Sequence, residues 1–222
     1  VMLADEGPLL GGRLLSDKRI IGNQSGLDWV RTTEAELASM QNVRIMTRTT
    51  IFGAYDHGVY GALERVNDHV ATPPAYEPRQ RAYRIYAKRA VLAAGAIERP
   101  HVFGNNDRPG VMLGSAMRTY INRYAVLPTK RVAIFTSSDE GYATAQDVIN
   151  SGGSVQAIID TRSDATISAP HDIPQFKGAK ILRTLGNKQV QGIEIELKDG
   201  ATRILDCDGV AMSNGWNPAV HL

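Results

Sequence analysis

The sequence has very little cysteine, and this shortage excludes one class of redox chemistry. Cys207 is the single cysteine among 222 residues, so no intrachain disulfide can form. The same count rules out a C-x-x-C redox centre. A disulfide reductase mechanism, which needs two cysteines, is therefore excluded.

Long apolar runs and an excess of charge are also lacking. No apolar run approaches the roughly 20 residues of a membrane span, and no signal peptide is visible. The formal net charge of +2 gives no reason to expect nucleic acid or a membrane surface as a partner. A hydrophobic content of 43% and a charged content of 22% are typical of a soluble globular protein, and we expect it in the cytoplasm.

A third absence concerns catalytic and metal-binding groups. His57 and His69 have no second ligand at metal spacing, so we interpret both as surface residues. No Ser/His/Asp or Cys/His set can be assembled from the spacing of the remaining residues. The sequence therefore predicts no metal site and names no catalytic residue.

The first residues of the chain predict half of a nucleotide site. Residues 1–4 form an apolar run, typical of a strand in a parallel sheet, and Asp5 and Glu6 follow directly. In dinucleotide-binding folds an acid at this place accepts hydrogen bonds from an adenosine ribose, about 20 residues after a G-x-G-x-x-G turn. That turn would precede Val1, which is not an initiator Met, so we expect a piece of a longer polypeptide. The alternative is that both acids are solvated turn residues.

Hydrophobic periodicity predicts two regions of regular structure. In the first, we expect a helix over 27–40 capped by Ser25, a strand over 43–52, and an antiparallel meander that ends in a buried strand over 90–94. In the second, a helix over 115–127 precedes a β-α-β unit over 131–160 and a polar loop over 161–176. Short strands are expected after that loop, at 179–183, 190–197, 201–205 and 207–213.

The second region predicts a dinucleotide fold that has lost its phosphate-binding turn. The three glycine positions of G-x-G-x-x-G fall on Thr136, Ser138 and Gly141. Only Gly141 survives, the position needed for close packing of helix against strand. Asp139 and Glu140 add negative charge at a helix N-terminus, where a phosphate would otherwise bind. Asp160 keeps the spacing of a ribose acid, so we expect the fold to be retained and the usual NAD(P) site to be lost. The alternative is that the Thr and Ser hydroxyls hold some ligand directly.

Several motifs resemble those of one family of flavoproteins. V-L-A-A-G-A-I-E-R-P at 91–100 and G-W-N-P at 215–218 resemble the two crossings between domains in flavoproteins with two dinucleotide-binding domains. Longer runs resemble the alpha subunit of heterotetrameric sarcosine oxidase, and this resemblance covers nearly all the chain. These runs are DEGPLLGGRLL (5–15), TTIFGAYD (49–56), HVFGNNDRPGVML (101–113) and VAMSNGWNPAVHL (210–222).

The resemblance implies an α/β fold with two dinucleotide-binding-like, three-layer domains and an antiparallel meander. Residues 1–100 would form a partial NAD-binding domain without its first strand and phosphate loop. Residues 101–222 would form an inserted Rossmann-like domain with a degenerate phosphate loop. We expect residues 1–100 to be poorly ordered when alone, while 101–222 fold.

The resemblance also implies cofactors and the residues that contact them. NAD would bind in the first domain, with Asp5 and Glu6 on the adenosine ribose, Arg13 near the phosphates and Ile51 at the adenine. Ala94 and Gly95 would lie along the cofactor; a strand that ends in small residues allows close approach to its backbone. A surface Arg and a core Ile are the alternatives for Arg13 and Ile51.

The wider complex implied by the resemblance includes beta, gamma and delta subunits. FAD would lie on the beta subunit, FMN at the alpha/beta interface, and tetrahydrofolate in an alpha-subunit domain outside these residues. The reaction implied is oxidative demethylation of sarcosine to glycine with formation of H2O2, and the isolated piece would be inactive. Two alternatives remain: an alpha-type subunit of a related amine, opine or hydroxyproline dehydrogenase, and a structural interaction module that binds no cofactor.

Overall fold

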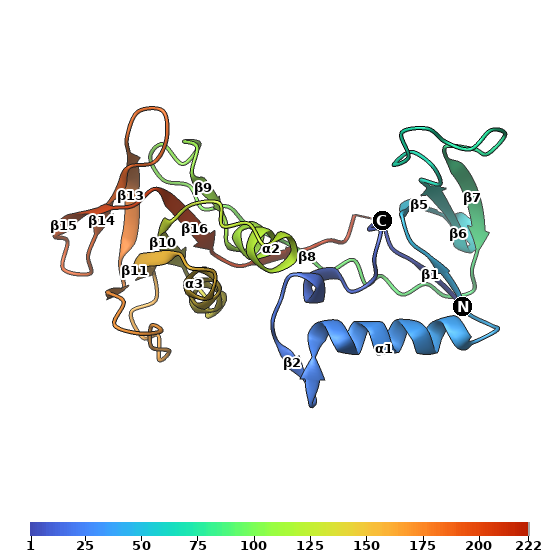
Figure 1. Cartoon of the computed structure of the whole chain (residues 1–222), viewed down its shortest axis with the longest axis horizontal. Helices are drawn as coiled ribbons and strands as arrows, with labels where there is room; N and C mark the ends of the chain where they lie inside the picture. The colour runs from blue at the N-terminus through green and yellow to red at the C-terminus, as the bar shows by residue number, and fades with distance from the viewer. Residues whose placement is uncertain (222) are drawn as a thin grey trace. The chain divides into compact units, whose positions relative to one another are not determined.

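The chain folds into two compact units. A computed structural model describes residues 1–221 (Figure 1). The first unit is Val1–Ala94, joined by the chain end from Val220, and the second is Gly95–Ala219. The chain therefore passes between the units twice. Within residues 1–221, none of the helices has the length and apolar content needed to cross a bilayer.

The first unit is built from short strands and one long helix. Its elements are β1 (Met2–Ala4), η1 (Gly12–Leu15), β2 (Ile20–Ile21), β3 (Gln24–Ser25), α1 (Gly26–Ser39), β4 (Arg44–Met46), β5 (Thr49–Tyr55), η2 (Asp56–Gly58), β6 (Val59–Glu64) and β7 (Arg81–Tyr86).

The predicted strand and helix at the start of the chain are confirmed. β1 pairs in parallel with β4, as an apolar run followed by an acid predicts. α1 begins where expected, because the Ser25 hydroxyl accepts a hydrogen bond from the Asp28 N–H at 3.1 Å. Ser25 Oγ in turn donates to the Asp28 carboxylate at 2.7 Å. This side-chain capping fixes the helix N-terminus.

The meander is present, but its predicted last strand over 90–94 is wrong, and so is the single strand predicted over 43–52. β5, β6 and β7 form a three-stranded antiparallel sheet. The predicted strand over 43–52 is two strands, β4 and β5, because the chain turns at Thr47–Arg48, where Arg48 has φ 53°. Residues 90–94 form no strand and are exposed, with Val91 92% accessible. An apolar run becomes a strand only beside a neighbour that accepts its hydrogen bonds, and these residues have none among those described.

The second unit contains the largest sheet among the described residues, with five strands. Its elements are β8 (Ala96–Glu98), β9 (Val111–Leu113), α2 (Gly114–Tyr124), β10 (Arg131–Thr136), α3 (Glu140–Asn150), β11 (Ser154–Asp160), β12 (Gln175–Lys177), β13 (Lys180–Leu185), β14 (Gly192–Glu196), β15 (Thr202–Asp206), β16 (Gly209–Ser213) and β17 (Trp216–Pro218).

A five-stranded parallel sheet forms the middle of three layers in this unit. Alternate residues of β10 point to opposite faces, as the strand period requires. Val132 and Ile134 pack with α2 and α3, whereas Ala133 and Phe135 pack with the antiparallel sheet of β13, β14 and β15. The β-α-β unit and the three-layer arrangement predicted for this region are confirmed.

In the sheet order β12-β11-β10-β16-β9, all strands run parallel and β10 lies at the centre. From β10 the chain proceeds outward to β11 and β12, while β16 lies on the other side of β10. β9 and β12 were missed in the sequence because each has three residues, too few for a periodic pattern. α2 ends at Tyr124, before Pro128, with Ala125 in the left-handed region at φ 54°.

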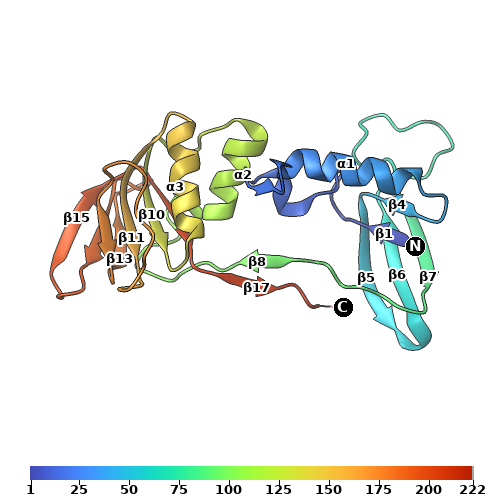
Figure 2. The same ribbon diagram turned by 90° about the horizontal axis from the view of Figure 1, so that it is seen from below.

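β8 and β17 form a two-stranded antiparallel ribbon at the start and end of the second unit (Figure 2). Its ladder is extended by bonds from Arg99 N–H to Gly215 O at 2.9 Å and from Ala219 N–H to Gly95 O at 3.0 Å. The two motifs that resemble domain crossings, residues 91–100 and 215–218, thus pair with each other over part of their length.

Candidate functional site

Asp5 lies at the carboxyl end of the parallel pair in the first unit. Its N–H donates to Met46 O at 2.9 Å, and its carbonyl accepts from Thr49 N–H at 2.8 Å. The half-buried side chain accepts a hydrogen bond from the Gly7 N–H at 2.7 Å through Oδ1. The carboxylate is therefore held at a strand end, in the position from which such acids bind a ribose.

Glu6 is exposed, and its backbone belongs to a loop fixed by two arginines. The Glu6 carbonyl accepts from the Arg65 guanidinium at 2.5 Å. Arg48 N–H donates to Gly7 O at 2.7 Å. The loop that carries both acids is thus bound to the residues that precede and follow the first hairpin of the meander.

The paired glycines before Arg13 have different roles. A Cβ at Gly11, where φ is 120°, would lie 3.1 Å from both Val30 methyl groups, so close packing against α1 requires glycine there. A Cβ at Gly12 would meet no atom within 4 Å. Arg13 follows on the exposed side of η1. The open backbone at Gly12 and the exposed Arg13 suit a ligand with phosphate groups.

Ile51 lies in β5, opposite the fully buried Ala62. Its side chain is half-buried, two residues after Thr49, whose N–H bonds to Asp5. The structure therefore brings Asp5, Glu6 and the first part of β5 together through backbone bonds.

Among the described residues, no hydrogen bond joins Ala94 or Gly95 to Asp5, Glu6 or β5. Both are exposed, and they fall on opposite sides of the division between the units. Gly95 has φ 69° and accepts the Ala219 hydrogen bond that closes the ribbon. The buried strand predicted to present these residues is not formed.

In the second unit, the residues of the degenerate turn, 136–141, form hydrogen bonds with one another and with Ser213. Thr136 is fully buried, and its hydroxyl lies 2.7 Å from Ser138 O and 2.9 Å from Ser213 O and accepts from Ser138 N–H at 3.0 Å. A Cβ at Gly141 would lie 2.5 Å from Thr136 Cβ, so the one surviving glycine is required by packing. Thr136 and Ser138, at the first two glycine positions, thus bond to each other where a phosphate-binding turn would leave its backbone open to the ligand.

Asp160, the counterpart of a ribose acid, is also satisfied within the protein. It accepts hydrogen bonds from the Tyr142 hydroxyl at 2.9 Å and from Arg162 Nη2 at 2.8 Å. Burial alone would raise the pKa of Asp160, but the bonds from Arg162 and Tyr142 outweigh it and hold that pKa below its ordinary value. Arg162 also pairs with Asp139 at 2.9 Å.

The same network raises the pKa of Tyr142 to about 12, mainly through burial and then through its bond to Asp160. Sequence reasoning missed both partners of this acid. An Arg two residues after the strand-end acid is a detectable signal, because its backbone and side chain can both reach the carboxylate.

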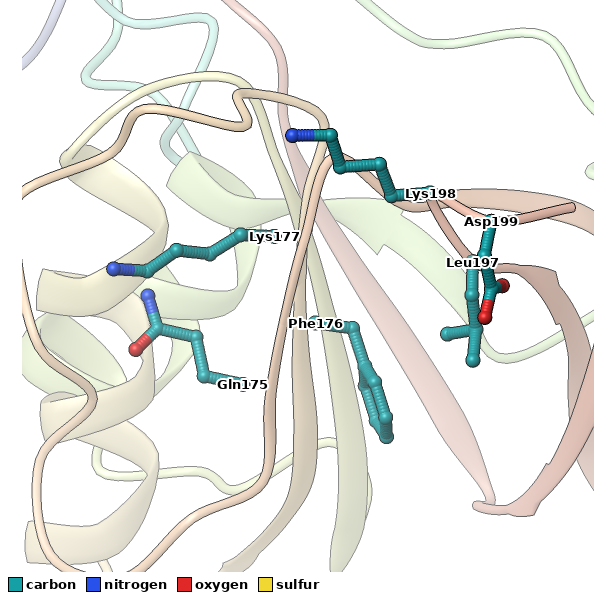
Figure 3. Close-up of a pocket in the computed structure, with 6 residues that line it drawn as sticks. All are labelled: Gln175, Phe176, Lys177, Leu197, Lys198 and Asp199. Carbon is teal, nitrogen blue, oxygen red and sulfur yellow. The ribbon is translucent and has the colours of Figure 1, made fainter. Parts of the chain in front are cut away.

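Two surface pockets lie in the second unit, and neither contains the predicted nucleotide residues. The larger, about 590 Å³, is open and lies between β12 and the β14–β15 turn, where Phe176, Lys177 and Lys198 line it (Figure 3). The other, about 380 Å³, lies beside Pro109, Lys130 and Asp208. Within residues 1–221, no three His, Cys, Asp or Glu side chains are placed to share a metal ion.

Curated proteins match the chain over its whole length. The alpha subunit of sarcosine oxidase from Rhizobium meliloti (strain 1021) is 46% identical over 222 residues, which are 100% of this chain and 22% of that protein. The same subunit from Corynebacterium sp. (strain U-96) is 34% identical over 238 residues, 100% of this chain and 24% of that protein. The chain thus spans about a quarter of the length of these relatives. No protein-family model matches it.

Solved structures show the fold. An L-proline dehydrogenase from P. horikoshii superposes with a TM-score of 0.70 at 22% identity, over 98% of this chain and 37% of that one. A bacillithiol disulfide reductase from Bacillus cereus superposes with a TM-score of 0.67 at 12% identity, over 98% and 70%. The predicted fold class is confirmed, and so is the resemblance to sarcosine oxidase alpha subunits.

Proposed function

We propose that this chain, similar from end to end to sarcosine oxidase alpha subunits, is the NAD-binding part of such a subunit. The observation that carries the proposal is the 46% identity over all 222 residues. The complete enzyme would oxidatively demethylate sarcosine to glycine, deliver the one-carbon unit to tetrahydrofolate and form H2O2. In that assembly this chain would bind and orient a nucleotide, and the reaction itself would occur elsewhere.

The first unit supplies groups that fit the adenosine half of NAD. Asp5, on its strand end, and Glu6 would accept hydrogen bonds from the ribose hydroxyls. Arg13 would lie near the pyrophosphate, beside the open backbone at Gly12. Ile51 would contact the adenine, and Ala94 and Gly95 would lie along the cofactor in the complete subunit. Bound there, NAD would supply a nicotinamide ring, the group that accepts or donates hydride.

The second unit, in this proposal, has kept a dinucleotide fold without its nucleotide. The Thr136 hydroxyl accepts a hydrogen bond from Ser138 N–H within the turn, and Arg162 donates to the Asp160 carboxylate. The groups that would bind NAD(P) therefore bind one another. This supports a single nucleotide on the first unit.

The proposed assembly contains further subunits and flavins. Beta, gamma and delta subunits would complete the enzyme, with FAD on the beta subunit and FMN at the alpha/beta interface. Tetrahydrofolate would bind a domain outside these residues, and the complex would be cytoplasmic.

A second candidate is an alpha-type subunit of a related amine or imino-acid dehydrogenase. The likeness to an L-proline dehydrogenase, with a TM-score of 0.70, favours it. Opine and hydroxyproline dehydrogenases fall in the same class. Turnover of the complete enzyme with sarcosine and with L-proline separates the two candidates.

Calorimetric titration of NAD into the full-length polypeptide tests the nucleotide site. Replacing Asp5→Ala removes charge-assisted hydrogen bonds, so we expect Kd to rise by about 10- to 100-fold. Asp160→Asn is the matched control, a strand-end acid in the second unit, and we expect it to leave Kd unchanged.

The opposite pattern, with binding lost in Asp160→Asn and kept in Asp5→Ala, would place NAD in the second unit and overturn the proposal. Absence of binding to the unmodified polypeptide would favour the structural interaction module.

A further inference from the structure

Glu98 is a buried carboxylate held by neutral groups. It is the last residue of β8 and only 3% exposed. Its Oε2 accepts a hydrogen bond from the Ser115 N–H at 2.7 Å, and its Oε1 accepts from the Ser213 hydroxyl at 2.8 Å. A buried carboxylate is costly unless its oxygens are satisfied, so these two donors fix its position.

The first of these donors belongs to the N-terminus of α2. That helix has Leu113 at its N-cap position, with no side-chain cap, and no acid in its first turn. The unpaired N–H groups and the dipole of a helix N-terminus favour an anion. The first turn of α2 contains no acidic residue, and the Glu98 carboxylate from β8 takes that place at the helix N-terminus.

The second donor connects Glu98 to the degenerate turn. Ser213 ends β16, and its carbonyl accepts from Ser137 N–H at 3.2 Å and lies 2.9 Å from the Thr136 hydroxyl. One residue thus bonds the closed turn through its backbone and Glu98 through its side chain. The carboxyl edge of the parallel sheet, which binds ligands in open α/β folds, is here bonded to parts of the same unit.

Glu98 also lies where the chain enters the second unit. Arg99, the next residue, donates to Gly215 O, and the far end of the ribbon is closed by the bond from Ala219 to Gly95. Both passages between the units therefore leave from the β8–β17 ribbon. We propose that the Glu98 carboxylate, through its bonds to Ser115 and Ser213, anchors this ribbon to the carboxyl edge of the five-stranded parallel sheet. As a consequence, β8 and β17 would move with the rest of the second unit as one body.

The test uses the full-length polypeptide with Glu98→Ala and needs no nucleotide. The variant leaves the Ser115 and Ser213 donors buried without an acceptor, so we expect the Tm of the second unit to fall by about 5–10 °C. Sodium formate should restore a large part of this loss, because its carboxylate fits the vacated donors, whereas sodium chloride at equal ionic strength should not. Glu196→Ala, which removes a half-exposed carboxylate paired with Lys180 in the same unit, is the control and should show no formate effect.

Hydrogen exchange distinguishes anchoring from a general loss of stability. In Glu98→Ala we expect the ribbon amides of Arg99 and Ala219 to lose protection, while the β10–β11 ladder keeps it. Equal loss across the whole unit, or no specific effect of formate, would overturn the proposal. An unchanged ribbon in Glu98→Ala would do so as well.

Discussion

Gly141 shows how much the place of a single residue in a sequence motif can reveal. Its position in a degenerate G-x-G-x-x-G pattern predicted a packing role, and a Cβ there would lie 2.5 Å from Thr136 Cβ. The prediction succeeded because packing of helix on strand is a local property of one turn.

Asp160 marks the limit of the same reasoning. Its spacing identified the strand-end acid, but its partners Tyr142 and Arg162 lie on a helix and on a loop. Which side chains reach a carboxylate depends on tertiary packing, and spacing does not contain that information.

The Asp160 network predicts a specific loss of stability in acid. Because the folded pKa of Asp160 lies below its ordinary value, the carboxylate stabilises the fold fully above its unfolded pKa of about 3.9. That contribution disappears as the pH falls from there through the folded pKa. We expect Asp160→Asn to lower the free energy of unfolding by about 2–4 kcal/mol at pH 7, and by progressively less as the pH falls below about 4.

Urea unfolding of both proteins from pH 3 to pH 7 measures this difference. Asp164→Asn, which changes an exposed acid on the following loop, serves as the control and should change little at any pH. A difference between Asp160→Asn and the parent protein that does not vary with pH would contradict the assignment.

Among the elements, helices and central strands were predictable and isolated apolar runs were not. α1, α3 and β10 carry their own signals in capping residues and period. The run at 90–94 has the composition of a strand but finds no partner among the described residues, so its side chains are exposed. A helix satisfies its own backbone, whereas a strand depends on residues far away in sequence.

The segment between β7 and β8 should therefore be the first site of proteolysis in this chain. Lys88 and Arg89 are exposed and lie outside any regular element. Because proteases cleave locally unfolded chain, brief trypsin treatment should cut after these residues and leave the second unit intact. Mass spectrometry of the fragments locates the cut.

A Lys88→Gln, Arg89→Gln double variant is the control and should slow that cleavage. First cuts within α3 or β13 instead would contradict the exposure of this segment.

At the scale of the whole molecule, the two units differ in the size of their cores. The second contains two clusters of buried apolar side chains, one on each face of the parallel sheet. In the first unit, the buried apolar residues among those described are Leu10, Val30, Met46 and Ala62. Small cores supply little of the burial that opposes chain entropy.

This asymmetry predicts unequal hydrogen exchange in the isolated chain. We expect the amides of β10, β11 and β16 to be strongly protected and those of β1, β4 and β5 to exchange faster, because local opening costs less where less apolar surface is buried. Exchange measured by mass spectrometry at neutral pH provides the comparison. Equal protection of the two halves would refute the expectation that residues 1–100 are poorly ordered alone.

Cys207 is fully buried directly after β15, so the reactivity of its thiol reports local unfolding of the core of the second unit. Burial raises the pKa of its thiol to about 12, so almost no thiolate is present at neutral pH. Alkylating reagents and oxidants react with the thiolate form of cysteine. The Cys207 side chain is a protonated thiol and is buried, so it is protected from both. Consumption of thiol reagent by the chain therefore requires that this core opens, and the labelling rate follows the fraction of molecules in which it is open.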